Sequence, residues 1–482
     1  MSTTRPKTLT AIQPAPILWW RGVAWLALLG PLFFITYSFT NQYAASLPEV
    51  SSVVFAWERH IPLLPWTIIP YWSIDLLYGL AFLLPRQRKL VDALGLRLLT
   101  AQVVCISCFL LWPLHFSVER PALSGVFGAM FDILMGFDKP YNQAPSLHIT
   151  LLIVLCACFA QHLSGVWRWL THGWFALIGL SVLTTWQHHF IDVPTGVLAG
   201  LFCIWCWPNA GRSPLLFWRH GKVKPHYALA SYYGFAGILC GVVAAYFSGV
   251  ALLLLWPCVS LLLVAFNYAC CGAMGFQKQD SGRLSFAATV LFAPYLVGAW
   301  LNSRLWTRGQ APADEVVSGV WLGRKPSASE AAQYVGLMDM CPELPIRLSK
   351  QLSTANHYQH LDVLDLTPLS AQQCWQAAKA IDSLNHAHYQ PILVYCALGY
   401  SRSSVALMAW LLLSGQAQTP ECAKELIEQA RPQVVIKAYH LAALEQMPLL
   451  PEFIDYQRHR AVVAKQNKQH FKRQPLTNQG QE

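Results

Sequence analysis

Nine apolar stretches set the first limit on how this chain folds. They cover residues 19–38, 63–84, 95–115, 147–163, 169–186, 191–208, 226–247, 250–271 and 284–302. A helix needs about 20 apolar residues to cross a bilayer, and in lipid its backbone must satisfy its own hydrogen bonds. Of the 482 residues, 55% are hydrophobic and only 12% are charged. These features predict a multi-pass helical membrane protein rather than a soluble one.

Positive charges between the stretches predict the orientation of the chain. They follow the second, fourth and sixth stretches, at Arg86, Arg88, Lys89, Arg168, Arg212, Arg219, Lys222 and Lys224. The positive-inside rule makes this face cytoplasmic and places the N-terminus inside. The first stretch is too long for a cleaved signal peptide, so we expect it to remain as an anchor.

Residues 391–415, PILVYCALGYSRSSVALMAWLLLSG, have the pattern of a strand, a loop and a helix. The pattern places the Cys396 thiol where a buried strand meets a helix N-terminus. Unpaired N–H groups and the helix dipole favour an anion there, either a thiolate or a phosphate. Arg402, six residues after the Cys, is suited to bidentate phosphate binding. Nucleophile, anion cradle and clamp therefore share one loop.

This Cys-x5-Arg loop resembles the signature of protein tyrosine phosphatases, and in particular the dual-specificity branch. The resemblance covers about residues 316–449 and implies that Cys396 is the nucleophile and Arg402 the phosphate clamp. It implies phosphate contacts from the loop, at Ala397, Leu398, Gly399, Tyr400, Ser401 and Ser403. The family carries its general acid about thirty residues before the nucleophile. Asp365, at the end of an expected strand and before an expected helix over 371–385, fits that position, and Asp362 is the alternative. Tyr395 stands where the family usually has His.

The membrane half carries its own chemistry-bearing motifs. KPYNQAPSLHI begins the fourth stretch with Ser146 and His148, and WQHHFIDV begins the sixth with His188 and Asp192. The fourth and fifth stretches form a hairpin, so both motifs fall on one side of the membrane. Ionisable groups at such depth are costly and typical of function. Residues four apart on a helix share a face, so Asp192 can orient the His188 imidazole.

Together with Arg120 in an Arg-Pro pair, these motifs resemble the type 2 phosphatidic acid phosphatase superfamily over about residues 60–210. The resemblance implies a phosphohistidine at His188, an acid at His148 and an orienting carboxylate at Asp192. Arg120 and Ser146 would contact phosphate. Two phosphate-binding cations of the family are replaced, by Pro113 and Val182. The site is thus expected to be an altered enzyme, a headgroup phosphotransferase or only a membrane anchor. His189 and Asp75 are expected to have mainly structural roles.

The expected fold class is a multi-pass α-helical membrane domain followed by an α/β dual-specificity phosphatase domain. The expected domains are an anchor over 1–60, a helical core over 60–210, further spans over 211–310, the phosphatase domain over 311–465 and a basic tail over 466–482. Fourteen scattered Cys suggest neither a disulfide framework nor a zinc site, and we expect no cofactor or metal. Expected partners are membrane lipids and a phosphorylated lipid or phosphoprotein substrate, without nucleic acid.

The two resemblances together suggest a protein of the bacterial inner (cell) membrane. Nine full crossings would deliver the Cys396 domain to the outside, whereas a thiolate persists best in the reducing cytosol. One of the last three stretches, where Pro294 interrupts the ninth, is therefore expected to be re-entrant or interfacial.

Overall fold

The structure is a computed structural model that describes residues 18–216, 225–352, 357–386 and 389–460. The basic tail over 466–482 lies outside the described residues. The chain divides into two compact units, and each is considered by itself. One comprises Met1–His220 and Ala236–Val259, and the other comprises Gly221–Phe235 and Ser260–Glu482.

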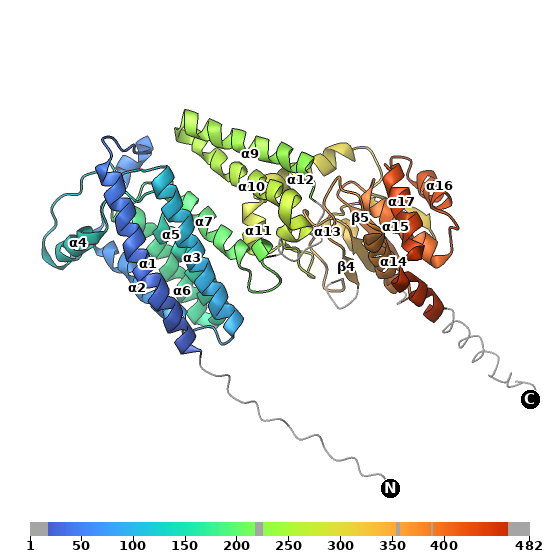
Figure 1. Ribbon diagram of the computed structural model, residues 1–482, viewed down its shortest axis with the longest axis horizontal. Helices are drawn as coiled ribbons and strands as arrows, with labels where there is room; N and C mark the ends of the chain where they lie inside the picture. The colour runs from blue at the N-terminus through green and yellow to red at the C-terminus, as the bar shows by residue number, and fades with distance from the viewer. Residues whose placement is uncertain (1–17, 217–224, 353–356, 387–388, 461–482) are drawn as a thin grey trace, which may run out of the picture. The chain divides into compact units, whose positions relative to one another are not determined.

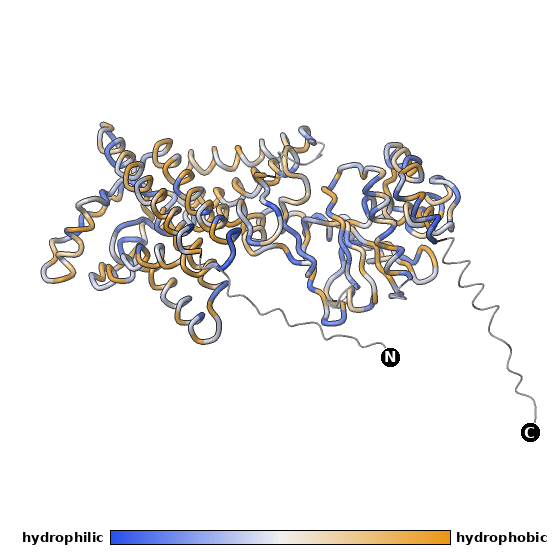
Figure 2. The backbone as a smooth tube through the Cα atoms, turned by 60° about the horizontal axis from the view of Figure 1, so that its bottom comes forward, coloured by the Kyte–Doolittle hydropathy of each residue, from blue (hydrophilic) through white to orange (hydrophobic). Residues whose placement is uncertain are grey.

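The first unit is helical (Figure 1). Its α-helices before residue 207 are α1 (Trp19–Ser46), α2 (Ile68–Ala81), α3 (Arg88–Leu111), α4 (Gly125–Phe137), α5 (Leu147–His162), α6 (Gly165–Thr184) and α7 (Asp192–Cys206), with short 3-10 helices at Ala56–His60 and Pro65–Thr67. Figure 2 shows that hydrophobic residues predominate along these helices. Helix α4 was not predicted; it lies in what the sequence suggested was a loop.

Two glycines of α7 allow this helix to approach α5 closely. A Cβ atom on Gly196 would lie 2.8 Å from the carbonyl oxygen of Ser146, and one on Gly200 would lie 2.9 Å from that of Thr150. Small residues four apart let two apolar helices come into backbone contact. This contact brings the N-terminal ends of α5 and α7 together.

Within the described residues, four helical segments are long and apolar enough to cross a membrane. They are Trp19–Ser46, Arg88–Leu111, Tyr227–Phe247 (α9) and Gly249–Phe276. The last of these contains a 3-10 turn at Gly249–Leu254, helix α10 (Leu255–Phe266), a π-turn at Asn267–Cys271 and a 3-10 turn at Gly272–Phe276. Each of the other five predicted stretches contains a helix, but α2, α5 and α7 have only 14, 16 and 15 residues. The ninth stretch is interrupted at Phe292, between α11 (Phe286–Leu291) and α12 (Ala293–Trp306).

The second unit contains a five-stranded sheet in the order β1-β2-β5-β3-β4. The strands are β1 (Ala313–Val317), β2 (Val320–Arg324), β3 (Gly336–Asp339), β4 (Tyr358–His360) and β5 (Ile392–Cys396). Strand β1 is antiparallel to β2, and all other pairs are parallel. The associated helices are α13 (Ala328–Ala331), α14 (Ala371–His386), α15 (Arg402–Ser414), α16 (Pro420–Ala430) and α17 (Ala438–Gln446).

Alternation along β5 divides its side chains between two cores. Ile392, Val394 and Cys396 belong to the large core formed with α14 to α17, whereas Leu393 and Tyr395 belong to a smaller core on the other face. The strand, loop and helix predicted over 391–415 are confirmed, and Gly415 ends α15 with φ 80°. The strand expected to end in Asp365 stops at His360. Beyond it, the carbonyls of Val363 and Leu364 accept hydrogen bonds from the side chains of Arg402 and Thr367 instead of joining a ladder.

Candidate active sites

Cys396 is the last residue of the central strand β5, and α15 begins six residues later at Arg402. Its Sγ atom accepts hydrogen bonds from the Gly399 backbone N–H and from the Ser403 hydroxyl, both at 3.3 Å. These donors and the helix N-terminus stabilise negative charge on sulfur. The side chain is 3% exposed, so the sulfur lies at the floor of the loop.

Gly399 gives the loop its tight curvature. Its φ is 75°, a conformation that favours glycine, and a Cβ atom there would lie 2.4 Å from the Gly323 carbonyl oxygen. The loop is also held from outside. The Ser303 hydroxyl of α12 donates to the Ala397 carbonyl at 2.5 Å, and the Tyr400 hydroxyl donates to the Trp306 carbonyl at 3.0 Å.

The guanidinium of Arg402 is buried and ordered by acceptors. Nη1 and Nη2 donate to the Glu343 carboxylate at 3.0 and 2.7 Å, and Nη1 also donates to the Val363 carbonyl at 2.9 Å. Nη2 lies 3.1 Å from Asp365 Oδ1. Nε has no hydrogen-bond partner within the described residues. Burial would lower the pKa of Arg402, but the charges of Glu343 and Asp365 raise it well above its usual value. The group remains a cation suited to an oxyanion.

The two candidate acids have different surroundings. Asp365 is 35% exposed and pairs with Arg402, which ends the loop that follows Cys396. Asp362 instead pairs with the His360 imidazole at 3.0 Å. Leu366, next to Asp365, has φ 56° and is 71% exposed, so the turn projects outward there. The structure therefore pairs Asp365 with Arg402 and pairs Asp362 with His360.

Tyr395 belongs to a buried cluster around Asp339. Asp339 Oδ2 accepts hydrogen bonds from the hydroxyls of Tyr395 and Tyr358, at 2.7 and 2.8 Å, and from Lys278 Nζ at 2.5 Å. Lys278 also donates to the carbonyls of Cys341 and Leu344. Burial and the charge of Asp339 raise the pKa of Tyr395 well above its usual value, so it stays a neutral donor. The cluster braces the end of the sheet from which the catalytic loop departs.

In the first unit, His188 is held between two polar side chains. Its Nδ1 lies 3.1 Å from Asp192 Oδ2, and its Nε2 lies 3.1 Å from Ser146 Oγ. The expected pairing of His188 with Asp192 is present, although α7 begins only at Asp192 and the pair does not lie on one regular helix. Asp192 also accepts from the His189 backbone N–H at 3.0 Å, which fixes its carboxylate.

His148 and Arg120 lie around this pair in different settings. The His148 ring stacks on Tyr71 with centroids 4.1 Å apart, and its Nε2 is buried without a partner in the described part of the chain. Tyr71 and Tyr37 both donate to the carboxylate of Asp138, at 3.2 and 2.6 Å. His189 pairs with Glu58 at 2.9 Å, in keeping with the structural role expected of it.

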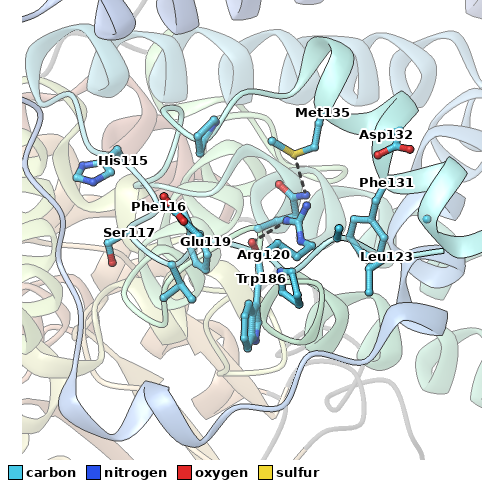
Figure 3. A pocket seen from close by; sticks show the side chains of 16 residues that line it. His115, Phe116, Ser117, Glu119, Arg120, Leu123, Phe131, Asp132, Met135 and Trp186 are labelled. Atoms are coloured by element: carbon cyan, nitrogen blue, oxygen red, sulfur yellow. Dashed lines mark hydrogen bonds between the residues drawn. The ribbon is translucent and has the colours of Figure 1, made fainter.

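Arg120 faces a cavity of about 600 Å³ beside this region (Figure 3). Its Nε and Nη2 donate to the carbonyls of Thr185 and Trp186, at 3.1 and 2.9 Å, and its guanidinium covers the Phe131 ring. The lining mixes aromatic and charged groups, including Glu119, Asp132, Phe131 and Trp186. Gln187, which directly precedes His188 in the sequence, also lines the cavity.

Several side chains that shape the sites were missed from the sequence. Glu343, Asp339 and Lys278 carry the buried charges around Arg402 and β5, and Tyr268 and Ser303 contact the acid and catalytic loops. Of these residues, Asp339 could have been noticed in the sequence, because a charged residue at the end of a buried strand is unusual. Nothing near the others in sequence indicates their partners, which lie 59 to 97 residues away.

Solved structures similar to part of this chain include phosphatases of the dual-specificity and protein tyrosine phosphatase type, matched over about 30% of it. A crystal structure of PTPMT1 in complex with PI(5)P is 21% identical, with 31% of this chain and 99% of that chain covered and a TM-score of 0.26. Tk-PTP in its active form is 21% identical over 28% and 95%, with a TM-score of 0.26. Human DUSP28 is 18% identical over 28% and 93%, with a TM-score of 0.25. No family model matches the chain, and no curated protein matches it either.

Proposed function

We propose that this protein is an integral membrane phosphatase that hydrolyses phosphomonoesters through a cysteinyl-phosphate at Cys396. The observation that carries the proposal is the meeting of three groups at one strand end. The Cys396 sulfur accepts two hydrogen bonds at a helix N-terminus, the Arg402 cation faces the same loop, and the Asp365 carboxylate touches that cation. Nucleophile, phosphate clamp and proton donor are what such a reaction requires.

The proposed reaction has two steps. In the first, the thiolate attacks phosphorus, a sulfur–phosphorus bond forms, and the bond to the leaving oxygen breaks as Asp365 gives that oxygen its proton. In the second, water attacks phosphorus, Asp365 takes the proton, and the sulfur–phosphorus bond breaks to release phosphate and restore the thiolate. Arg402 Nε and Nη2 bind two phosphate oxygens throughout, with Asp365 leaving Nη2 as phosphate arrives.

The proposed substrate is a phosphate presented at the membrane surface, either on a phospholipid or on a phosphoprotein. The described part of the chain contains four helical segments long and apolar enough to cross a bilayer, and tethering a catalytic loop to the membrane raises its effective concentration toward lipid phosphates. We place the protein in the bacterial inner (cell) membrane, with its N-terminus and the Cys396 domain in the cytosol.

Phosphate release by the purified full-length protein tests the Cys396 site. Cys396→Ser is expected to abolish turnover of small aryl phosphates, because a hydroxyl is not ionised at neutral pH. Cys422→Ser is the matched control, since Cys422 is exposed and the same atom is exchanged. Full activity of Cys396→Ser would remove the thiol from the mechanism.

We propose a second, His-based site in the membrane half. The placement of His188 between Asp192 and Ser146 favours it, since a carboxylate on Nδ1 leaves Nε2 as the nucleophilic nitrogen. In this proposal His148 is the acid, while Ser146 and Arg120 bind phosphate. The alternatives are transfer of the phosphate-bearing headgroup to an alcohol, or a membrane half that serves only as an anchor.

The Cys396→Ser protein isolates the second site for measurement. A lipid phosphatase activity that resists thiol alkylation and disappears on further exchange His188→Ala is the expected result. Product that forms only when an acceptor lipid is added would favour the transferase. No turnover across a broad phospholipid panel would favour the anchor.

A further inference from the structure

A residue of a candidate membrane-crossing segment contacts the loop that carries Asp365. Tyr268 lies in the π-turn that follows α10, within the apolar segment Gly249–Phe276. Its hydroxyl donates a hydrogen bond to the backbone carbonyl of Asp365 at 3.1 Å. The two residues are 97 positions apart in the sequence and belong to the same compact unit.

The Tyr268 side chain is fixed by its neighbours. It is 1% exposed, and its ring stacks on Tyr233 of α9 with centroids 5.5 Å apart. Tyr233 in turn meets the Tyr295 ring edge to face at 5.7 Å. The Tyr268 carbonyl accepts the His226 backbone N–H at 2.9 Å, at the start of α9. Ring and backbone are therefore both anchored to the hairpin of α9 and α10.

The acid loop has little regular structure of its own. Residues 361–370 lie outside strands and helices, and the turn at Leu366 is exposed with a positive φ. A backbone in this state takes its position from the side chains that bind its carbonyls. Arg402 binds the Val363 carbonyl, and Tyr268 binds the Asp365 carbonyl, on the residue that bears the carboxylate itself.

We propose that Tyr268 is a positioning residue for the general acid, and that the α9–α10 hairpin thereby sets the placement of Asp365 over the Cys396 thiol. The inference rests on the function proposed above. The Tyr268 hydroxyl is hydrogen-bonded to the Asp365 carbonyl, so it acts through the Asp365 backbone. Protonation of the leaving group then depends on the membrane hairpin, while attack by the thiolate does not.

The test is Tyr268→Phe in the full-length protein in nanodiscs, because Phe keeps the ring stack and removes only the hydroxyl. Two substrates are compared, p-nitrophenyl phosphate with its activated leaving group and an alkyl phosphate whose leaving oxygen needs a proton. The kcat for the alkyl phosphate is expected to fall about 2- to 10-fold, which corresponds to the net free energy of one hydrogen bond. The kcat for p-nitrophenyl phosphate and both KM values are expected to stay unchanged.

Two further variants complete the design. Tyr246→Phe, on α9 and 81% exposed, is the matched control and should change neither substrate. In the Asp365→Asn background, Tyr268→Phe should add no further loss, because the proton donor is already absent. Equal slowing of both substrates, or a full additional loss in that background, would overturn the positioning role.

The outcome separates this inference from the function on which it rests. If Asp365→Asn slows the alkyl phosphate selectively and Tyr268→Phe does not, only the role of Tyr268 is wrong. If Asp365→Asn shows no selectivity, or Cys396→Ser still hydrolyses p-nitrophenyl phosphate, the proposed chemistry itself is wrong.

Discussion

Glu343 holds Arg402 in a two-pronged ion pair, with oxygen to nitrogen distances of 2.7 and 3.0 Å and both side chains 3% exposed. A buried guanidinium needs such a partner, because a charge removed from water is costly unless it is paired. Burial would raise the pKa of Glu343, but the Arg402 charge lowers it overall, so the pair stays ionised. The carboxylate thus fixes the plane of the proposed phosphate clamp.

Glu343→Gln is expected to weaken both stability and catalysis. The amide keeps the shape but removes the buried counter-ion of Arg402 and leaves only the partly exposed Asp365, which costs about 3 kcal/mol of unfolding free energy. The KM for phosphate esters should rise as the guanidinium loses its orientation. Denaturant unfolding and steady-state kinetics measure the two effects, and Glu445→Gln, at an exposed position of α17, is the matched control. Unchanged KM in Glu343→Gln would show that other contacts orient Arg402.

Asp365→Asn and Asp362→Asn separate the two candidate acids. Only Asp365 contacts Arg402, whereas Asp362 contacts His360. Loss of a general acid costs on the order of 10²- to 10⁴-fold for a leaving group that needs a proton, and far less for an activated one. We expect this selectivity from Asp365→Asn alone, measured as the ratio of kcat values for alkyl and p-nitrophenyl phosphate. The same selectivity from Asp362→Asn would reverse the assignment.

We expect the stability of α17 to depend on pH because of His440. Its Nδ1 accepts the Lys437 backbone N–H at 3.1 Å, an arrangement that requires an unprotonated nitrogen. Burial, with a smaller effect of Lys437, lowers the pKa of His440 to about 4, against about 6.5 when unfolded. The unfolded state therefore binds more protons between these values, and stability is lost as pH falls from about 6.5 to about 4.

Amide hydrogen exchange of α17 across this pH range measures the effect. His440→Gln should flatten the pH dependence, because an amide oxygen can accept the same N–H without titrating. His386→Gln serves as the control, since that side chain is 57% exposed. An equal pH dependence in His440→Gln would assign the acid sensitivity to other groups.

Gly196→Val is expected to separate α7 from α5 and so disturb the His188 site. An added Cβ would already meet Ser146 O and Ile149 Cβ at 2.8 Å, and the two methyl groups of Val enlarge the clash. Overpacking of this kind typically costs about 1 to 3 kcal/mol. Thermal unfolding in detergent compares it with Gly173→Val on α6, where a Cβ meets nothing within 4 Å. Equal midpoints for the two variants would contradict a close helix contact.

A fragment that begins at residue 311 is expected to be unstable and poorly active, although it keeps Cys396, Arg402 and Asp365. It lacks Lys278, which leaves the buried Asp339 carboxylate without its cation, at a cost of about 3 to 5 kcal/mol. It also lacks Ser303 and Tyr268, which hold the catalytic and acid loops. A fragment beginning at residue 225 retains these contacts and is the matched comparison in detergent. Equal stability of both fragments would refute this coupling.

Local pattern was enough to predict the strand, loop and helix around Cys396. The β-branched run before Cys396, the small residues of the loop and Gly415 at the helix end each favour one local structure, and all agree. The helix at Ala371–His386 followed from similar signals. In the first unit, the sequence argument expected Ser146 and His188 near each other at the ends of neighbouring helices, and the structure places them in contact.

The partners of the buried charges were beyond sequence reasoning. Glu343 lies 59 residues from Arg402 and Lys278 lies 61 from Asp339, and no local periodicity encodes such pairings. The predicted strand before Asp365 was too long. The alternating sequence pattern continues beyond the point where the backbone carbonyls accept hydrogen bonds from side chains instead of from a neighbouring strand. Helix α4 was overlooked because its apolar run is too short for a bilayer span.

Hydrogen bonds connect the sheet and its loops to three residues that precede it in the sequence, Lys278, Ser303 and Tyr268. These contacts limit where the chain can be divided and joined to another protein. A boundary placed by hydropathy near residue 311 separates apolar helices from a polar α/β part. It also separates Cys396, Arg402 and Asp365 from the residues that support their loops. An α/β part cut there could not be moved to another anchor without rebuilding those supports. For recombination, natural or engineered, a boundary near residue 225 keeps those supports with the sheet.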